Sequence, residues 1–459
     1  MQYLTIWDVV LTPFYLLILA AIAKRHRDKK YPRGHQLRPY YLQGLYLKFA
    51  GAIFIAVIYQ FYYGGGDTFN YYYHAKIINS SLNDSVSTWI NLLLRRPPEV
   101  DPKMYQYTSQ MYWYTDPSAY PISVIAAILG LLNGTTYIPI ALLFAYLSYS
   151  GIWAMYKTFA RIYPQLHKPL AIAFLFVPST FVWGSAIFKD TVCMFALGWM
   201  TCCTFRLIVD KDFSFRNLFL LVISFYLLAT IKIYIVLAFA PALALWVMLT
   251  YSHKIKAAAV RWVVNFMFIG ISVAGLLFFA KRFATELNEY SLDNISKKAQ
   301  KTQVWITYVS DVSEGSKYDI GRIDGTLGGM VMKFPQAVNV TLYRPYLWEA
   351  KKPIMLLSAL EAAAFLVLTL KVFYKKGISQ TFKQVGKDPN LMFFLIFTIV
   401  FAFAVGVSTG NFGSLSRYKI PCMPFFASLL LILYYQPRAI VSTRKVVTHE
   451  AKEPVHRFA

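Results

Sequence analysis

The sequence predicts an all-α, polytopic helical membrane protein. Hydrophobic residues make up 57% of the 459-residue chain and charged residues only 15%. The apolar residues come in continuous blocks of roughly 17 to 22, the length at which a helix crosses a bilayer. A transmembrane β-barrel would show segments of about ten residues with alternating apolar and polar side chains, a pattern that the sequence lacks. We therefore expect residues 1–459 to form a single integral membrane domain.

The net charge of +24 would suggest nucleic-acid binding in a soluble protein. Much of the excess lies in short loops between apolar blocks, where lysine and arginine mark the cytoplasmic face, so no nucleic-acid partner is expected. The cysteines lie within or at the edge of apolar blocks, without the spacing of metal ligands, and are expected to be small core residues. They are Cys193, Cys202, Cys203 and Cys422.

Residues 6–23 form the first predicted span. The loop after it carries seven Lys or Arg and one Asp between Lys24 and Arg38, which makes it the firmest cytoplasmic anchor and places the N-terminus outside. The second span, 46–63, returns to the outer face. Residues 64–118 then form a first outer loop rich in Tyr and Trp, in which we expect amphipathic helices on the membrane surface. A simple interfacial belt of aromatic residues is the alternative.

The next stretch leaves two topologies open. Residues 137–156 are long enough to cross, and three basic residues follow this segment as far as Lys168. If these basic residues are cytoplasmic, 120–132 stays outside and 168–184 crosses. If they are outside, the two roles reverse.

Basic loops also place the remaining apolar blocks. These blocks are 190–208, 217–231, 233–250, 262–280, 353–373, 391–408 and 419–435. The polar segment 281–352 is expected to be a second outer loop with interfacial helices. The total is about eleven crossings, with a range of about 10 to 13, an outer N-terminus and a cytoplasmic C-terminus.

Ionisable residues near membrane depth gather on the outer face of this topology. Asp67 lies in Gly64-Gly-Gly-Asp-Thr-Phe-Asn-Tyr-Tyr-Tyr-His74, where three glycines allow a sharp turn. Five cations on the same face are candidates to bind phosphate or pyrophosphate. They are Lys189, Lys232, Arg344, Arg417 and Lys419. Any one of them is better explained as an interfacial anchor, whereas five on one face favour a polar cavity.

Further polar residues are candidates to support this site. They are His74, Asp190, Glu349, Glu361 and Asn411. Asp190 is explained equally well as an ion pair with its neighbour at a helix start. Glu361 is roughly 12 Å deep in its span, where an acid is either functional or hydrogen-bonded to another helix. No P-loop, Gly-x-Ser-x-Gly, His-Glu-x-x-His or Cys-x-x-Cys motif appears, and no metal site is predicted.

These motifs resemble those of GT-C-type polytopic membrane glycosyltransferases and of bacterial exopolysaccharide and O-antigen polymerases. In such enzymes an acidic residue of the first large outer loop is the catalytic base, and Asp67 matches that feature. The run Arg417-Tyr-Lys-Ile-Pro-Cys-Met-Pro424 is similar to an Arg-Tyr-x-x-Pro-x-x-Pro that opens a late span in several members. Tyr343-Arg-Pro-Tyr-Leu-Trp-Glu349 is similar to a stretch in bacterial membrane proteins near polysaccharide clusters. The chain departs from the pattern because Asp67 follows the second span and its loop has no Asp-x-Asp or Glu-x-Asp pair.

The resemblance implies a glycosyltransferase or polysaccharide polymerase of the bacterial inner membrane. Its donor would be a saccharide on polyprenyl phosphate or pyrophosphate, and its acceptor a saccharide or lipid-linked saccharide, with the prenyl chain held in the lipid bilayer. Asp67 would accept the proton of the attacking hydroxyl, and the cations would hold the phosphate. A divalent cation, Mg²⁺ or Mn²⁺, stays open as a cofactor.

Two other kinds of function compete with this expectation. A flippase or transporter of lipid-linked saccharides would also use a cationic cavity. Against it, the sequence shows no inverted repeat and no matching pair of broken helices. The third reading is a non-catalytic subunit of an envelope machine.

Overall fold

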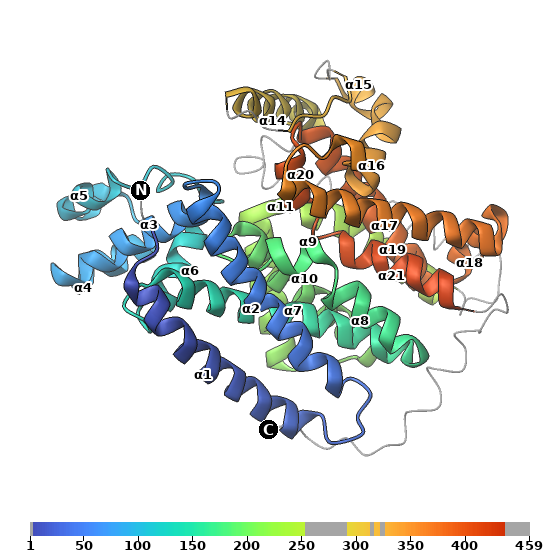
Figure 1. Ribbon diagram of the computed structural model, residues 1–459, viewed down its shortest axis with the longest axis horizontal. Helices are drawn as coiled ribbons and strands as arrows, with labels where there is room; N and C mark the ends of the chain where they lie inside the picture. The colour runs from blue at the N-terminus through green and yellow to red at the C-terminus, as the bar shows by residue number, and fades with distance from the viewer. Residues whose placement is uncertain (1–2, 253–291, 313–315, 322–325, 437–459) are drawn as a thin grey trace.

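The computed structural model describes residues 3–252, 292–312, 316–321 and 326–436. This part of the chain forms helices joined by turns, and its β structure is limited to an isolated bridge between Lys317 and Asn411. Figure 1 shows the long helices packed as one bundle, with α3, α4 and α5 gathered near the N-terminus. The prediction of an all-α fold is confirmed.

Seven of the described helices are long and apolar enough to cross a membrane. They are α1 (Ile6–Lys30), α2 (Arg38–Phe61), α7 (Tyr137–Ile162), α10 (Lys189–Phe205) with the π-helical turn η5 (Arg206–Asp210), α11 (Phe215–Ser252), α17 (Pro353–Lys376) and α19 (Pro389–Ser408). An eighth span results if α20 (Phe412–Tyr418) and α21 (Met423–Tyr435), which meet at 72°, are taken together. A multi-pass membrane protein is thus supported. This count takes α11 as one helix and does not reproduce the predicted eleven crossings. The predicted span 262–280 lies outside the described residues.

The two ends of the bundle are named after Asp67 and Arg38. α1 begins at the Asp67 end, where the ring of Tyr3 stacks on that of Phe69 with centroids 4.4 Å apart. It leads to the basic loop at the Arg38 end, and α2 returns to the Asp67 end. The predicted orientation, with the N-terminus outside, stays a prediction.

α7 runs from the Asp67 end to the Arg38 end. Near its start the hydroxyls of Tyr137 and Thr68 are hydrogen-bonded at 2.6 Å. Near its end Trp153 Nε1 donates to the Tyr31 hydroxyl at 2.7 Å. The basic residues after α7 therefore lie at the same end as the basic loop between α1 and α2.

The chain then returns through α8 (His167–Leu175) and the short α9 (Pro178–Trp183), and α10 begins at the Asp67 end. By contrast, α6 (Tyr120–Gly130) stays at the Asp67 end. The Tyr120 hydroxyl donates to the Leu92 carbonyl at 2.9 Å, and Asn79 Nδ2 to the Ala127 carbonyl at 2.8 Å. In this arrangement 168–184 runs between the two ends of the bundle and 120–132 stays at one end. Which of the two crosses the membrane stays a prediction.

α11 reverses direction at Lys232, whose φ of −148° and ψ of 74° are not helical. Two hydrogen bonds join its ends to the last turns of α10: Asn217 Nδ2 to the Cys203 carbonyl (3.2 Å) and the Tyr251 hydroxyl to the Ile208 carbonyl (2.8 Å). Lys232 instead contacts Asp190 in the first turn of α10. The predicted spans 217–231 and 233–250 are therefore antiparallel halves of α11, with Lys232 at their turn.

The core lies where α7 and α10 cross. A Cβ on Gly198 would lie only 2.0 Å from the Gly151 carbonyl oxygen. Glycine at both positions allows the two backbones to touch, as small residues do in membrane helix pairs. Aromatic rings fill the adjoining space, with Phe159 and Phe394 centroids 4.6 Å apart.

Shorter elements make up the rest of the described chain. They are α3 (Asp67–Ser80), η1 (Ser81–Asn83), α4 (Val86–Leu93), η2 (Pro98–Val100), η3 (Pro102–Met104), α5 (Tyr105–Thr108), η4 (Pro164–Leu166), α14 (Leu292–Val312), α15 (Leu327–Met332), α16 (Phe334–Tyr343), η7 (Leu347–Glu349) and α18 (Ile378–Lys387). Val86 and Ile90 of α4 and Leu94, the residue that caps its C-terminus, form an exposed apolar stripe, the pattern of an interfacial helix. Membrane contact by this stripe stays a prediction.

The described parts of the second predicted loop, 281–352, lie at the Asp67 end. Tyr318 N donates to the Gly410 carbonyl at 3.2 Å, and Phe412 N to the Ser316 carbonyl at 2.9 Å. This pairing places residues 316–318 beside the start of α20. Figure 1 shows α14 and α15 above α20.

Candidate functional site

A three-glycine turn places Asp67 at the start of α3. Gly64, Gly65 and Gly66 have φ values of +68°, +150° and +127°, which residues with a Cβ rarely adopt. Asp67 is the first residue of α3, where the helix dipole favours a carboxylate. Its side chain is 46% exposed, so it can meet a ligand from outside.

Gly66→Ala is expected to destabilise the protein clearly more than Gly64→Ala. A Cβ at Gly66 would lie 2.7 Å from the Tyr59 ring, whereas nothing lies within 4 Å of a Cβ at Gly64. Both variants carry the strain of a positive φ, about 1–2 kcal/mol, and only Gly66→Ala adds the clash. Thermal unfolding of the purified variants measures the difference, and equal melting temperatures would contradict this account of the turn.

Arg417, in the last turn of α20, joins two carboxylates. One guanidinium nitrogen lies 3.0 Å from Asp67 Oδ2, and the other 3.5 Å from Asp190 Oδ2. The guanidinium also lies over the ring of Phe188, 4.2 Å from its centroid, and is hydrogen-bonded to the Tyr59 hydroxyl. Arg417 thereby links α3 to the first turn of α10.

Asp190 is also ion-paired with Lys232 at the turn of α11. The side chains of Asp190 and Lys232 are only 1% and 7% exposed. The Lys232 ammonium lies 4.4 Å from the centroid of the Tyr418 ring. We call Asp67, Asp190, Lys232 and Arg417 the charge network; it holds two carboxylates and two cations, and of the two carboxylates Asp67 is the more exposed.

Lys189 precedes Asp190 in the sequence, but its side chain binds residues outside the charge network. Its ammonium donates to Ser118 Oγ at 2.8 Å and lies 3.8 Å from Asp116 Oδ2. Burial raises the pKa of Asp116, but the Lys189 charge and the hydrogen bonds from Ser118 and Ala119 outweigh it and hold the pKa below its usual value. Asp116 is therefore a carboxylate that the sequence analysis did not single out, although it is bound to a predicted site lysine.

Arg344 and Glu349 form a separate pair. Arg344 Nε lies 3.0 Å from Glu349 Oε2, and a second guanidinium nitrogen binds Oε1. Burial raises the pKa of Glu349, but the bonds from Arg344 and from Tyr346 N outweigh it and keep the pKa below its usual value. The guanidinium is 5.4 Å from the centroid of the Phe412 ring, so the pair adjoins the start of α20, whereas Arg417 lies in its last turn.

The structure does not bring Lys419 and Glu361 to the charge network. Lys419 is fully buried beyond the end of α20. Glu361, on α17, accepts a hydrogen bond from Ser179 N at 2.6 Å. This contact matches the second explanation given for Glu361 above, a hydrogen bond to another helix.

The side chains of Asn411 and His74 make contacts that stabilise the local fold. Asn411 Oδ1 caps α20, accepting from Gly413 N at 2.6 Å and Ser414 N at 3.2 Å. His74 is fully buried in α3, and its ring lies 4.9 Å from that of Tyr112. These contacts give Asn411 a helix-capping role and place His74 in the aromatic packing of the first loop.

The stability of the protein is expected to fall as the pH drops through the range set by His74. Burial lowers the pKa of His74 from 6.5 to about 4. Between these values the unfolded chain binds a proton that the folded protein does not, so the free energy of unfolding falls with decreasing pH, by about 3 kcal/mol in full. Thermal unfolding at about pH 7 and about pH 5 measures the slope. His74→Phe should reduce it, and an unchanged slope would show that other groups cause it.

Each of the four cations in or near the charge network already faces a carboxylate. Lys189 faces Asp116, Lys232 faces Asp190, Arg344 faces Glu349, and Arg417 faces two carboxylates. The predicted net positive cavity is therefore a set of ion pairs. An anionic ligand has to replace a carboxylate on one of these cations, and the most exposed carboxylate of the charge network is Asp67.

The described residues do not fit a divalent cation. No three His, Cys, Asp or Glu side chains among them are close enough to hold a metal ion. The two carboxylates of the charge network are occupied by Arg417 and Lys232. No catalytic step is therefore assigned to Mg²⁺ or Mn²⁺.

No protein-family model, no curated protein and no solved structure matches the chain. The resemblance to membrane glycosyltransferases thus rests on the motifs around Asp67, Arg344 and Arg417 alone.

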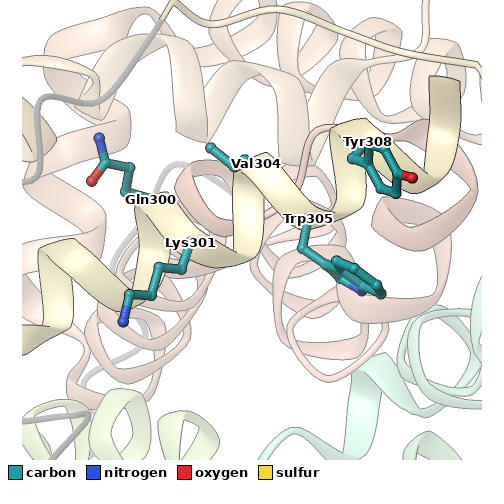
Figure 2. Close-up of a pocket in the computed structure, with 5 residues that line it drawn as sticks. All are labelled: Gln300, Lys301, Val304, Trp305 and Tyr308. Atoms are coloured by element: carbon teal, nitrogen blue, oxygen red, sulfur yellow. The ribbon is translucent and has the colours of Figure 1, made fainter.

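A surface depression on α14 lies away from the charge network. It has a volume of about 480 Å³. Figure 2 shows that its lining side chains all project from this one helix: Gln300, Lys301, Val304, Trp305 and Tyr308. An exposed tryptophan, tyrosine and lysine on one helix face are typical of a membrane interface. This depression is not enclosed by a second element and does not serve as the catalytic site.

Lys48 is a buried cation that the sequence analysis missed. Its ammonium donates to the carbonyls of Thr180 (3.0 Å) and Gly184 (2.6 Å) and to Ser148 Oγ (3.1 Å). These bonds satisfy backbone carbonyls that the short α9 leaves without helical partners. Lys48 could have been recognised from the sequence as a lysine inside the apolar stretch 46–63.

Proposed function

We propose that the protein is a membrane glycosyltransferase or polysaccharide polymerase. It transfers a saccharide from a polyprenyl phosphate or pyrophosphate carrier at the Asp67 end of the bundle. The observation that carries this proposal is the 3.0 Å pair of half-exposed Asp67 with Arg417, an arginine held from behind by buried Asp190. A base and a phosphate-binding group are thereby in contact at one point.

In this mechanism the donor phosphate takes the place of Asp67 on the Arg417 guanidinium. Arginine binds phosphate through two parallel hydrogen bonds, so the exchange leaves Arg417 paired and frees the Asp67 carboxylate. An acceptor hydroxyl then attacks the anomeric carbon, and the bond from that carbon to the phosphate oxygen breaks with its electron pair. Asp67 accepts the hydroxyl proton, and Arg417 stabilises the charge on the leaving phosphate. Asp190 and Lys232 hold Arg417 in place.

The proposed setting is the bacterial inner membrane. The Asp67 end faces outward and the basic Arg38 end faces the cytoplasm, as the distribution of Lys and Arg favours. The prenyl chain of the donor lies in the bilayer beside the bundle, and the acceptor is a saccharide or a lipid-linked saccharide. Both loops with short helices, α3 to α5 and α14 to α16, share the Asp67 end with the charge network.

Asp67→Asn tests this function. We expect cells with the variant to accumulate the same unextended lipid-linked saccharide as a deletion strain, with transfer reduced roughly 100-fold or more. Asp84→Asn is the matched control, since this carboxylate lies in the same loop and, among the described residues, is hydrogen-bonded to Gln106 and Tyr107. Lipid-linked and surface saccharides are quantified at equal membrane abundance. Normal surface saccharide in Asp67→Asn would refute the proposal and favour a non-catalytic subunit.

One observation favours a transporter of lipid-linked saccharides as the second candidate. The sequence analysis found no matching pair of broken helices, but two interrupted segments face each other in the structure. The break between α9 and α10 and the 72° bend between α20 and α21 adjoin, with Ile420 Cδ1 3.5 Å from a Cβ placed on Gly184. Broken helices often surround transport sites. Purified protein in vesicles that moves a lipid-linked saccharide across the bilayer without lengthening it would support this candidate.

A further inference from the structure

Four buried polar atoms around α9 lack a hydrogen-bond partner in the described structure. They are Ser179 Oγ, Thr180 Oγ1, Glu361 Oε1 and Lys419 Nζ. Ser179 and Glu361 are joined by the 2.6 Å bond from Ser179 N to the other carboxylate oxygen. Lys419 interacts electrostatically with Glu361. The four atoms come from three elements in mutual contact: α9, α17 and the link between α20 and α21.

Opposite charges buried this deeply require each other. Glu361 is 6% exposed and Lys419 is 0% exposed, and an ion in the membrane interior is costly unless it is paired. No carboxylate oxygen of Glu361 lies within 4.0 Å of Lys419 Nζ. The ion pairs described above, by contrast, all fall within that distance. A third polar group has to connect them.

A small cavity beside Glu361 has the size and chemistry for water. Its volume is about 30 Å³, and Ser179, Ser358 and Glu361 contribute its polar lining. One water needs roughly 10–15 Å³ and two to four polar partners, so one or two molecules fit. The rest of the lining is apolar, and Phe54 and Leu357 also lie on the outer surface of the bundle. Thr180 and Lys419 do not line this cavity, so it provides room for water on the Glu361 side of the pair.

We propose that Ser179, Thr180, Glu361 and Lys419 form a water-binding site inside the bundle, in which bound water links the Glu361 carboxylate to the Lys419 ammonium. The site does not depend on the proposed transferase activity.

A double-mutant cycle tests the coupling. Glu361→Gln and Lys419→Met should each lower the melting temperature of the purified protein by about 5 °C or more, because each leaves one buried charge without its partner. The double variant should regain most of that loss. Lys419→Met combined with Thr398→Val is the control, since Thr398 is also buried with an unpartnered hydroxyl but lies on α19. Losses at Glu361 and Lys419 that simply add would overturn the proposal.

A high-resolution experimental map tests the water itself. We expect density within hydrogen-bond distance of both Glu361 Oε1 and Lys419 Nζ in the unmodified protein, and its loss in Glu361→Gln with Lys419→Met. Direct contact between the two charged atoms would overturn the water bridge even if the two residues prove coupled. Because neither measurement uses saccharide transfer, a negative result here leaves the Asp67 test unaffected.

Discussion

Asp190→Asn is expected to remove most of the folded protein from the membrane fraction. Asp190 is 1% exposed and accepts hydrogen bonds from both Lys232 and Arg417. Removing its charge leaves Lys232 buried without a carboxylate and Arg417 with only the half-exposed Asp67. Breaking a buried ion pair in this way costs about 3–5 kcal/mol, a large fraction of the stability of a typical protein. Quantitative detection of the variant in washed membranes measures the loss.

Two companion variants separate loss of charge balance from loss of chemistry. Asp190→Asn with Lys232→Met removes one charge of each sign and should restore part of the abundance. Asp67→Asn should leave abundance near that of the unmodified protein, because a side chain that is 46% exposed is stabilised by water when its partner is lost. An abundant but inactive Asp190→Asn protein would instead point to Asp190 as a direct participant in transfer.

The sequence predicted the all-α fold class and the positions of several long apolar helices because these follow from local patterns. Apolar length and basic loops are sufficient to recognise α1, α2, α7 and α10. The turn at Lys232 was predicted because a single lysine separates two apolar blocks. The sequence left open which of 120–132 and 168–184 runs between the two ends of the bundle, because this depends on the end of the bundle that each segment contacts.

The charge network was predictable in part for the same reason. Asp67, Asp190, Lys232 and Arg417 all lie where spans end, and ends on one side of a bundle are neighbours. Their pairing was not predictable, because hydrogen bonds between residues as distant as Asp67 and Arg417 require the three-dimensional fold. The expected excess of positive charge was therefore wrong for the described site.

Lys419 shows how spacing within a turn misled the sequence prediction. It follows Arg417 by two residues, and the backbone remains helical through it. Residues two apart on a helix point to nearly opposite sides, so Arg417 reaches Asp67 whereas Lys419 enters the bundle toward Glu361. Buried Asp8 gave no signal either: its Oδ1 accepts from Ile138 N at 2.7 Å, a contact between distant parts of the chain.

Arg417→Lys is expected to reduce saccharide transfer about 100-fold or more while changing protein abundance much less than Asp190→Asn does. Lysine keeps the positive charge, so Asp67 and Asp190 still face a cation. A single ammonium cannot present a planar fork to phosphate or span Asp67 and Asp190, which Arg417 contacts with two different nitrogens. Loss of one group that stabilises a developing negative charge typically costs about 100-fold or more in rate.

Initial rates with purified protein and a short-chain prenyl pyrophosphate saccharide would measure this effect. If the donor phosphate replaces Asp67 on Arg417, the lysine variant should lose kcat together with affinity for a prenyl phosphate lacking the sugar. Arg344→Lys is the control, because Arg344 is paired with Glu349 beside the start of α20 and should affect the rate less. A normal rate in Arg417→Lys would exclude the guanidinium as the phosphate ligand. An equal loss in both variants would mean that the donor extends from the charge network to the Arg344–Glu349 pair, and that both arginines contact its phosphates.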